Sequence, residues 1–344
     1  MAATQRGSAL RRTCWPRHSR RTQIILGEYA VFCIVHEVTE ATRRWNKDLQ
    51  VQQALARVML RAPDGDRLPT VTQLCRDFGV GSGTVQSAMR ALADQEAVSI
   101  VARGHLGTAV VSRNLCLLWQ LSGAGPLECS MPLPMSLEIT GLAAAFHAVA
   151  DELRVQLRFS FSQGIRRRFK ALEDGRTDVV AGSTTAVASL VRPDDRVLDL
   201  NDYSFYAMDS VVVLTRSGES VDRRGRVPID RNSLDHSSLT KAEFPEAKFV
   251  DAAYTMVPEL LVRGDVDAAV WHRTSASPLL NASGVDMHPL EHLSPTDLAP
   301  VSRASLLVAD GERGAGDLID LIVRDPLFQQ VQREVIDQKR TPEY

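Results

Sequence analysis

The sequence predicts two structured parts, a small α+β head followed by a larger α/β domain. Residues 46–112 change from helical apolar periodicity to strand alternation, which is typical of helices followed by a β-hairpin. Residues 127–344 alternate short apolar segments with helix-length segments, which is typical of α/β construction. Residues 113–126 are expected to form a linker that packs on one of these domains.

The head is expected to begin with two helices joined by a short connection. An amphipathic helix is predicted over residues 48–61, and Pro69 precedes the second helix because proline is excluded from a helix interior. Thr70 follows as a natural N-cap. The apolar positions of the second helix recur at i, i+3, i+4 and i+7, at Val71, Leu74, Cys75 and Phe78. Gly79 then supplies the turn, as glycine commonly does after a helix.

A third helix and a hairpin complete the predicted head. The inward positions of this helix are Val85, Ala88, Met89 and Leu92. Val98 and Ile100 then alternate as in a strand. Residues 103–107 form a glycine-bounded tip, and residues 108–111 form the return strand.

This order of elements is typical of a winged helix-turn-helix that binds double-stranded DNA. Its last helix enters the major groove, where polar side chains meet base edges, and the hairpin tip contacts phosphates or the minor groove. The candidate DNA-binding residues are Thr70, Ser82, Thr84, Gln86, Arg90, Arg103 and His105. The alternative is a small helical domain with a hairpin and no DNA role.

Several motifs of the head match a known family. They are Arg67–Thr70, Phe78–Val80, Thr84–Val85, Arg103–Gly104 and Gly107–Thr108. With them the stretch resembles the N-terminal domain of GntR-superfamily transcription regulators. Four further segments are similar to the YhfZ-type branch, namely Gly83–Ala88, Ala102–Thr108, Leu118–Gln120 and Met131–Pro134. The resemblance begins near Leu49 and extends into the C-terminal region. It implies a winged helix-turn-helix joined to a two-lobed α/β domain similar to type 2 periplasmic binding proteins.

The chain departs from that family at the start of the third helix. The family usually has a basic residue there, whereas this chain has Gly81, Ser82 and Gly83. Serine can bond a phosphate or a base edge, but it cannot make the bidentate guanine contact of arginine. Either specificity depends on Gln86, Arg90 and the hairpin, or DNA affinity is weaker than is usual for the family.

Composition sets further bounds on the protein. The chain has 344 residues, 44% of them hydrophobic, which leaves room for two or three domains with a core. The formal net charge is −2, so any DNA contact depends on local charge. The five cysteines form no CxxC pair, and no apolar run approaches the roughly 18 residues of a membrane span. A cytoplasmic protein is therefore expected, without a membrane segment, metal or cofactor.

Residues 1–45 are predicted to be a basic, disordered N-terminal extension. Residues 1–23 contain six arginines and no acidic residue. Three alternatives remain open: a basic arm that binds DNA, a targeting peptide with a weak twin-arginine resemblance, and an extension from a start codon placed too far upstream.

The second part is expected to have parallel α/β units in two lobes around a cleft. The predicted strands are Leu127–Met131, Val155–Phe161, Asp178–Ala181, Ser210–Leu214, Val227–Ile229, Lys248–Val250, Asp267–Trp271 and Ser305–Val308. The predicted helices are Leu137–Leu153, Ile165–Leu172, Ala186–Val191, Ser233–Glu243, Thr255–Val262, Ala315–Val323 and Pro326–Ile336.

Ligands of open α/β sheets bind beside the carboxyl ends of strands and the first residues of helices. The candidate ligand-binding residues in such loops are Pro132, Pro134, Ser136, Ser162, Gln163, Ser183, Thr184, Asp230, Asn232, Ser233, Tyr254 and Trp271. Hydroxyl and amide groups there suit a small anion, although Ser183, Thr184 and Ser233 are equally typical of simple N-caps.

Two charged features lie near these loops. Arg166–Arg168 is interpreted as the solvated start of a helix, with an anion site as the alternative. Asp178 and Asp267 each precede an apolar strand in a pattern that occurs twice. The resemblance to binding proteins implies that both aspartates are structural.

Together these features predict a bacterial transcription regulator. A homodimer would bind two DNA half-sites, and a small anionic metabolite between the lobes would change its DNA affinity. The alternative is a solute-binding or sensory protein whose helical head only dimerises. An enzyme is disfavoured because the sequence contains no GxSxG, HExxH or GxxxxGK[ST] motif, and no catalytic residue is proposed.

Overall fold

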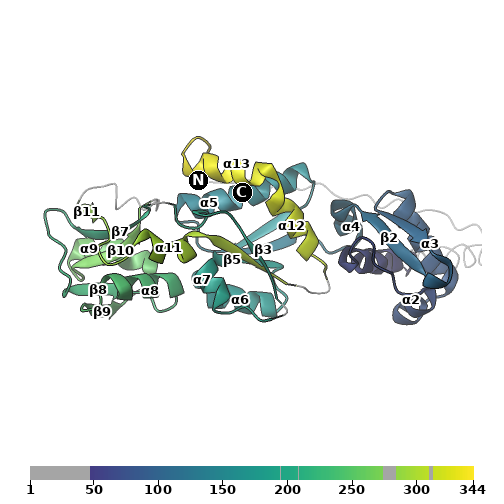
Figure 1. Ribbon diagram of the computed structural model, residues 1–344, viewed down its shortest axis with the longest axis horizontal. Helices are drawn as coiled ribbons and strands as arrows, with labels where there is room; N and C mark the ends of the chain where they lie inside the picture. The colour runs from purple at the N-terminus through teal and green to yellow at the C-terminus, as the bar shows by residue number, and fades with distance from the viewer. Residues whose placement is uncertain (1–46, 194, 208, 274–283, 310–312) are drawn as a thin grey trace, which may run out of the picture. The chain divides into compact units, whose positions relative to one another are not determined.

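A computed structural model describes residues 47–193, 195–207, 209–273, 284–309 and 313–344. The predicted N-terminal extension, residues 1–45, lies outside these ranges. The described chain consists of a head and two lobes (Figure 1). None of its helices is long and apolar enough to cross a membrane.

The head has the predicted winged helix-turn-helix fold. Its elements are a helix over residues 47–61, α2 (Val71–Phe78), α3 (Ser82–Asp94), β1 (Val98–Ala102), the 3-10 helix η1 (Gly104–Leu106) and β2 (Thr108–Arg113). Strands β1 and β2 pair antiparallel, and Arg67 forms a further bridge with Ala109. The four predicted inward residues of α3 are all buried, and they pack with Leu55 and Leu74.

The turn between α2 and α3 forms as its sequence predicts. Thr70 is the N-cap of α2 and makes a capping box with Gln73, whose backbone N–H donates to the Thr70 hydroxyl at 3.2 Å. Gly79 ends the helix with φ of 63°, a left-handed conformation that glycine adopts without a steric penalty.

Half of the predicted linker, residues 113–126, is a helix, α4 (Leu115–Leu121), capped by Asn114. Leu118 and Trp119 are buried, so the expectation that the linker packs on a domain is confirmed. Its helical form was missed because the segment is too short to show a clear period.

The first lobe is built on a five-stranded sheet of order β4-β3-β5-β12-β6. Its strands are β3 (Leu127–Met131), β4 (Leu157–Phe161), β5 (Val179–Ser183), β6 (Arg196–Asp199) and β12 (Ala304–Val308). Its helices are α5 (Leu137–Glu152), α6 (Ile165–Glu173), α7 (Thr184–Ala188), α12 (Gly316–Arg324) and α13 (Pro326–Ile336). Helices α5 and α13 pack together, and Phe146 meets Phe328 edge to face at 5.0 Å (Figure 1).

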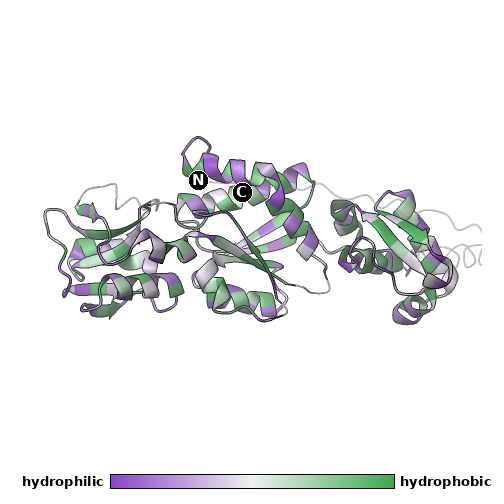
Figure 2. Ribbon diagram, in the orientation of Figure 1, coloured by the Kyte–Doolittle hydropathy of each residue, from purple (hydrophilic) through white to green (hydrophobic). Residues whose placement is uncertain are grey.

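The second lobe contains two small sheets, β10-β7-β11 and β8-β9. Its strands are β7 (Val211–Arg216), β8 (Arg226–Ile229), β9 (Lys248–Asp251), β10 (Ala268–His272) and β11 (Val285–His288). Its helical segments are α8 (Leu234–Glu243), η2 (Tyr254–Met256), α9 (Val257–Arg263) and α11 (Pro295–Ser302). Apolar residues concentrate along the strands of both lobes (Figure 2).

The predicted parallel units form only in part. β3 is parallel to β4 and β5, and β8 is parallel to β9, but β12 runs antiparallel to β5 and β6, and β7 pairs antiparallel with β10 and β11. The chain crosses between the lobes after β6 and returns before β12, and the returning strand enters the first sheet in the opposite direction.

Three elements of the lobes were not predicted. Strands β6 and β11 lie at sheet edges and are half-exposed, so neither shows a continuous apolar run. Helix α11 contains Pro295 and Pro300, which obscure its helical pattern.

Candidate functional site

The exposed face of α3 carries most of the side chains predicted to contact DNA. Ser82, Gln86 and Arg90 are exposed and Thr84 is half-exposed, whereas the opposite face of the helix is buried in the head. The helix therefore presents hydroxyl, amide and guanidinium groups to solvent on one side, which is the pattern needed to contact base edges.

The first turn of α3 is open to close approach. Gly81 is its N-cap and makes no side-chain hydrogen bond, and the first turn contains no acidic residue. A Cβ atom added at Gly81 or Gly83 would meet nothing within 4 Å. The residues that replace the family's basic side chain thus leave backbone N–H groups accessible to an anion.

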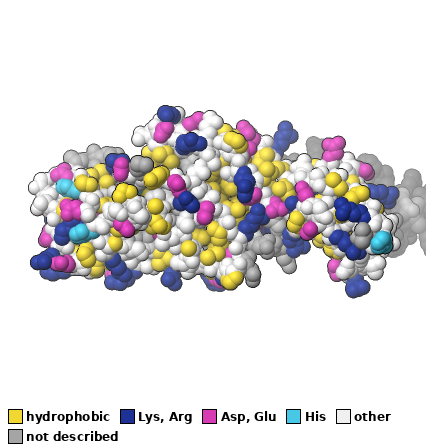
Figure 3. Space-filling view, in the orientation of Figure 1, with side chains coloured by type: hydrophobic (Ala, Val, Ile, Leu, Met, Phe, Trp, Pro, Cys, Tyr) yellow, Lys and Arg dark blue, Asp and Glu magenta, His cyan; other side chains and the backbone are white. Residues whose placement is uncertain are grey.

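The hairpin adds positive charge beside this helix. Arg103 and His105 are exposed at the tip, and Figure 3 shows basic side chains beside a histidine on the head. Arg67, which was not among the candidate DNA-binding residues, is exposed and its guanidinium packs against Gly107, where an added Cβ would lie 2.6 Å from Arg67 Nε. Thr70 is exposed, but its hydroxyl is engaged by Gln73 in the capping box.

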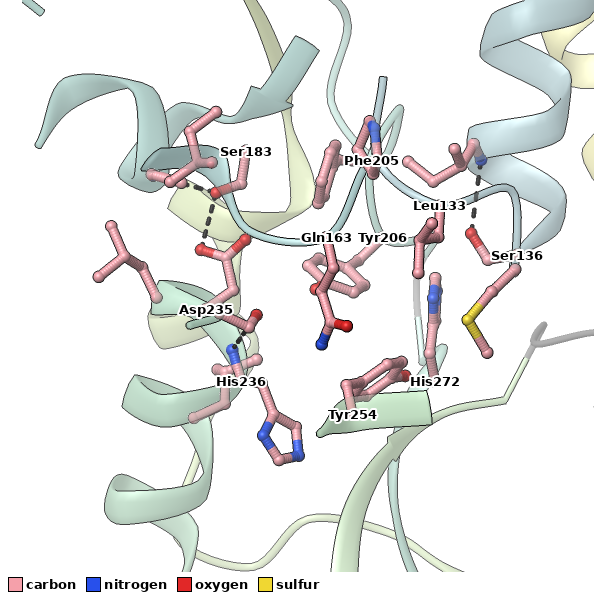
Figure 4. Close-up of a pocket in the computed structure, with 18 of the residues that line it drawn as sticks. Leu133, Ser136, Gln163, Ser183, Phe205, Tyr206, Asp235, His236, Tyr254 and His272 are labelled. Atoms are coloured by element: carbon pink, nitrogen blue, oxygen red, sulfur yellow. Dashed lines mark hydrogen bonds between the residues drawn. The ribbon is translucent and has the colours of Figure 1, made fainter. Parts of the chain in front are cut away.

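A cavity of about 130 Å³ lies where the two lobes meet. Seven of the predicted ligand-binding residues line it: Pro132, Ser136, Gln163, Ser183, Ser233, Tyr254 and Trp271. The predicted loops of both lobes therefore converge on one cavity (Figure 4).

Five predicted residues are not brought to the cavity wall: Pro134, Ser162, Thr184, Asp230 and Asn232. Asp230 lies one layer behind, where it accepts hydrogen bonds from the Gln163 side chain and from the backbone N–H of Asn232 and Tyr254. Thr184 bonds to the Arg303 carbonyl and to Ser305. The Ser162 carbonyl accepts from Arg168.

The three serines of the cavity are also helix caps. The hydroxyls of Ser136, Ser183 and Ser233 accept the backbone N–H groups of Ile139, Ala186 and His236, respectively. The N-cap interpretation therefore holds for Ser183 and Ser233, while both still face the cavity.

Arg168 corrects the interpretation of Arg166–Arg168 as a solvated helix start. Arg166 and Arg167 are exposed, but Arg168 is only 5% exposed and lines the cavity. Its Nε donates to the Ala181 carbonyl at 3.1 Å, and Nη1 donates to the Ser162 carbonyl at 2.6 Å. Burial lowers its pKa to about 10, so the guanidinium remains charged at neutral pH.

Asp235 is the opposing charge, contributed by α8 of the second lobe. Its Oδ1 accepts the Ser183 hydroxyl at 2.7 Å, a bond that joins the lobes. Burial raises the pKa of Asp235 to about 6, against the opposing effects of Ser183 and Arg168. The carboxylate is therefore charged at neutral pH and close to its titration.

Two histidines complete the polar wall. His236 Nδ1 accepts the Asp230 N–H at 3.1 Å, and burial lowers the pKa of His236 to about 4, so this ring is neutral at neutral pH. His272 Nε2 lies 3.3 Å from the buried carboxylate of Glu138, which also accepts the Ala207 N–H at 2.9 Å.

Aromatic rings form much of the rest of the wall. Tyr254 stacks on Trp271 at 4.3 Å, and Tyr206 packs against His272 at 4.7 Å and against Phe205 at 5.1 Å. An apolar wall with a few fixed polar groups is typical of a small-molecule site.

The two aspartates of the repeated pattern are structural here. Asp178 accepts the Glu128 N–H at 2.8 Å and pairs with Arg313, and Asp267 accepts the Arg226 N–H at 2.7 Å. Asp178 thus connects the residue before β5 to β3, and Asp267 connects the residue before β10 to β8. Neither aspartate lines the cavity.

Sequence reasoning missed the side chains that set the character of the cavity. Phe205 and Tyr206 lie in the crossing segment between β6 and β7, where no motif marks them. Asp235 and His236 were not among the predicted ligand-binding residues, although both line the cavity. The available signal was their place in the first turn of a helix that opens at a predicted ligand loop.

The architecture defines a class of protein, a winged helix-turn-helix domain joined to a two-lobed α/β domain with a cavity between its lobes. Residues 115–344 match the YhfZ C-terminal domain family and residues 64–110 match a helix-turn-helix domain family. The chain therefore belongs to the YhfZ family.

The chain is also similar to individual proteins. The protein YhfZ of Escherichia coli (strain K12) is 27% identical over 246 residues, which cover 71% of this chain and 80% of that protein. The crystal structure of YhfZ from Shigella flexneri is 25% identical, covers 64% of this chain and 99% of that chain, and has a TM-score of 0.44. The periplasmic VFT2 domain of Bordetella pertussis BvgS is 17% identical, covers 65% and 98%, and has a TM-score of 0.47.

Proposed function

We propose that the protein is a cytoplasmic, sequence-specific DNA-binding regulator whose DNA affinity depends on a small molecule held between its lobes. The observation that carries the DNA half is the exposed polar face of α3 beside a basic hairpin tip. A homodimer would place two such helices in major-groove half-sites about one helical turn apart.

The open first turn of α3, at Gly81–Gly83, supports separate roles for the residues that would contact DNA. Open N–H groups at the start of α3 suit a phosphate, which would fix register without reading sequence. Base reading would then depend on Gln86 and Arg90, with Arg103 and His105 on the neighbouring groove or backbone.

A hydrogen bond between Arg113 and Asp317 joins the head to the first lobe, and further bonds hold each partner in place. Arg113, at the end of β2, donates to Asp317 of α12 at 2.8 Å and to the Leu60 carbonyl at 2.8 Å. Asp317 also accepts from Arg196 of β6 at 2.6 Å. These bonds support a mechanism in which the state of the lobes influences the head, provided that the ligand favours one arrangement over another.

The test is an anisotropy titration of the full chain against its own upstream DNA and a scrambled fragment, at two salt concentrations. We expect tighter binding to the upstream fragment and weaker binding at higher salt, because phosphate contacts release counterions. The double variant Gln86→Ala, Arg103→Ala should lose the preference, whereas Arg333→Ala, an exposed arginine of α13, should not.

The alternative is a sensory protein whose head only dimerises, and the absence of a basic residue at Ser82 favours it. If the wild-type chain binds neither fragment at either salt, with and without ligand, the regulator proposal fails and this alternative is favoured.

A further inference from the structure

The cavity contains two buried side chains of opposite charge that do not neutralise each other directly. Arg168 comes from the first lobe and Asp235 from the second, and they are 5% and 7% exposed. The charge of Arg168 acts on Asp235 without a hydrogen bond between them. Because burying a charge is costly when its partner is distant, each is a position where an opposite charge on a ligand would gain free energy.

Both groups keep unused hydrogen-bonding capacity. Nε and Nη1 of Arg168 are engaged by carbonyls, whereas Nη2 has no hydrogen-bond partner among the residues that the structure describes. One oxygen of Asp235 accepts from Ser183, and Figure 4 shows the other directed toward the open part of the cavity. A carboxylate matches the first group and an ammonium matches the second.

The size and wall of the cavity limit what else the ligand can carry. A volume of about 130 Å³ is close to the roughly 150 Å³ of a cavity that holds benzene, so about five to eight non-hydrogen atoms fit. Ile139, Val211 and Leu239 supply an apolar surface for a short aliphatic group. The buried indole N–H of Trp271, which also lines the cavity, has no partner among the described residues and offers a further donor.

From this arrangement we infer that the cavity binds a small zwitterion, a short α-amino acid whose carboxylate meets Arg168 and whose ammonium meets Asp235. This inference rests on the proposed function, since it names the ligand class of the same cavity. A simple anion would place a like charge beside the Asp235 carboxylate, and a simple cation would place a like charge beside the Arg168 guanidinium. A zwitterion satisfies both, and it bonds to both lobes at once.

The experiment is isothermal titration of the full chain with glycine, L-alanine and L-serine, each small enough for the cavity. Propionate and ethylamine serve as matched ligands that carry only one of the two charges. We expect at least one amino acid to bind and both single-charge analogues to bind at least 10-fold more weakly. Heat from propionate equal to that from L-alanine, or no heat from any of the three amino acids, would overturn the inference.

Variants assign the two charges. Asp235→Asn keeps the acceptor for Ser183 but removes the charge, so amino acid affinity should fall on the order of 10- to 100-fold. The same variant should bind propionate more tightly than the wild type, a reversal that general damage to the fold would not produce. Arg168→Lys should weaken amino acid binding, because lysine lacks the planar fork. Asp337→Asn, an exposed aspartate of the first lobe, is the control and should change neither affinity.

The two proposals fail in distinguishable ways. If an amino acid binds but leaves DNA affinity unchanged, its regulatory role is wrong and the assignment of the cavity stands. If the chain prefers its upstream DNA but no amino acid binds, the ligand class is wrong and the DNA-binding regulator stands. Thermal unfolding of each unliganded variant confirms that a lost affinity reflects the site and not the fold.

Discussion

The substitution Asp235→Asn should stabilise the protein at neutral pH by an amount that disappears in acid. Burial raises the pKa of Asp235 from 3.8 to about 6, so the native state holds its proton more tightly than the unfolded chain does. The stability that the protonated Asp235 carboxyl group contributes is therefore fully present below pH 4 and is lost as the pH rises from about 4 to 6. At about 1.4 kcal/mol for each pKa unit, the ionised carboxylate costs the native state at most about 3 kcal/mol.

Asparagine removes this cost, since it stays neutral and can still accept the Ser183 hydroxyl. Urea unfolding of the unliganded wild type and the variant should therefore differ by up to about 3 kcal/mol at pH 7 and by nearly nothing at pH 4. The difference between the two proteins is the useful quantity. His236 titrates in the opposite sense, because its lowered pKa makes stability fall as the pH drops from 6.5 toward 4. That contribution is common to both proteins and cancels.

Two results would refute this reasoning. In the first, the difference in free energy of unfolding between the two proteins does not change with pH. In the second, the wild type is the more stable protein at pH 7. The first would mean that Asp235 is not desolvated in the native state. The second would mean that Arg168 and Ser183 more than offset its burial. Arg168 and Ser183 are the groups that oppose the effect of burial on the pKa of Asp235. The charge of Asp235 acts on Tyr206, but burial raises the pKa of Tyr206 far above neutrality, so Tyr206 does not titrate in this window.

Two further predictions concern the head. Leu92→Ala removes a fully buried side chain of α3 and should lower the free energy of unfolding, measured by urea unfolding, by about 2–5 kcal/mol. The control Gln86→Ala, at an exposed position of the same helix, should change it by nearly nothing. A cost of Leu92→Ala below about 1 kcal/mol would mean that the site collapses around the smaller side chain. Arg113→Ala removes the bonds to Asp317 and the Leu60 carbonyl and should cost about 2 kcal/mol. It should also weaken any effect of ligand on DNA binding, and a full ligand effect in this variant would show that these bonds carry no coupling.

The head could be predicted almost residue by residue because its signals are local. Thr70 caps the helix that follows it, Gly79 adopts the left-handed conformation that its position requires, and the four apolar positions of α3 are buried. Capping, turns and helical periodicity depend on neighbours within a few residues, which the sequence itself displays. The strand directions of the lobes could not be predicted in this way, since the antiparallel entry of β12 between β5 and β6 depends on how the chain returns from the second lobe.

The cavity shows why loop positions could be predicted while charge could not. Strand ends identify loops that must converge, and seven residues chosen on that ground line one cavity. Arg168 belongs to a run of three arginines, which from the sequence is expected to be solvated. Its position on α6 places it on the buried side of the helix, where it donates to a carbonyl of β5, while Arg166 and Arg167 are exposed. Asp235 becomes a cavity residue only because the second lobe brings α8 against Ser183 of the first. Our inference of a ligand with both charges therefore depends on tertiary contacts, whereas the sequence alone led us to expect a small anion.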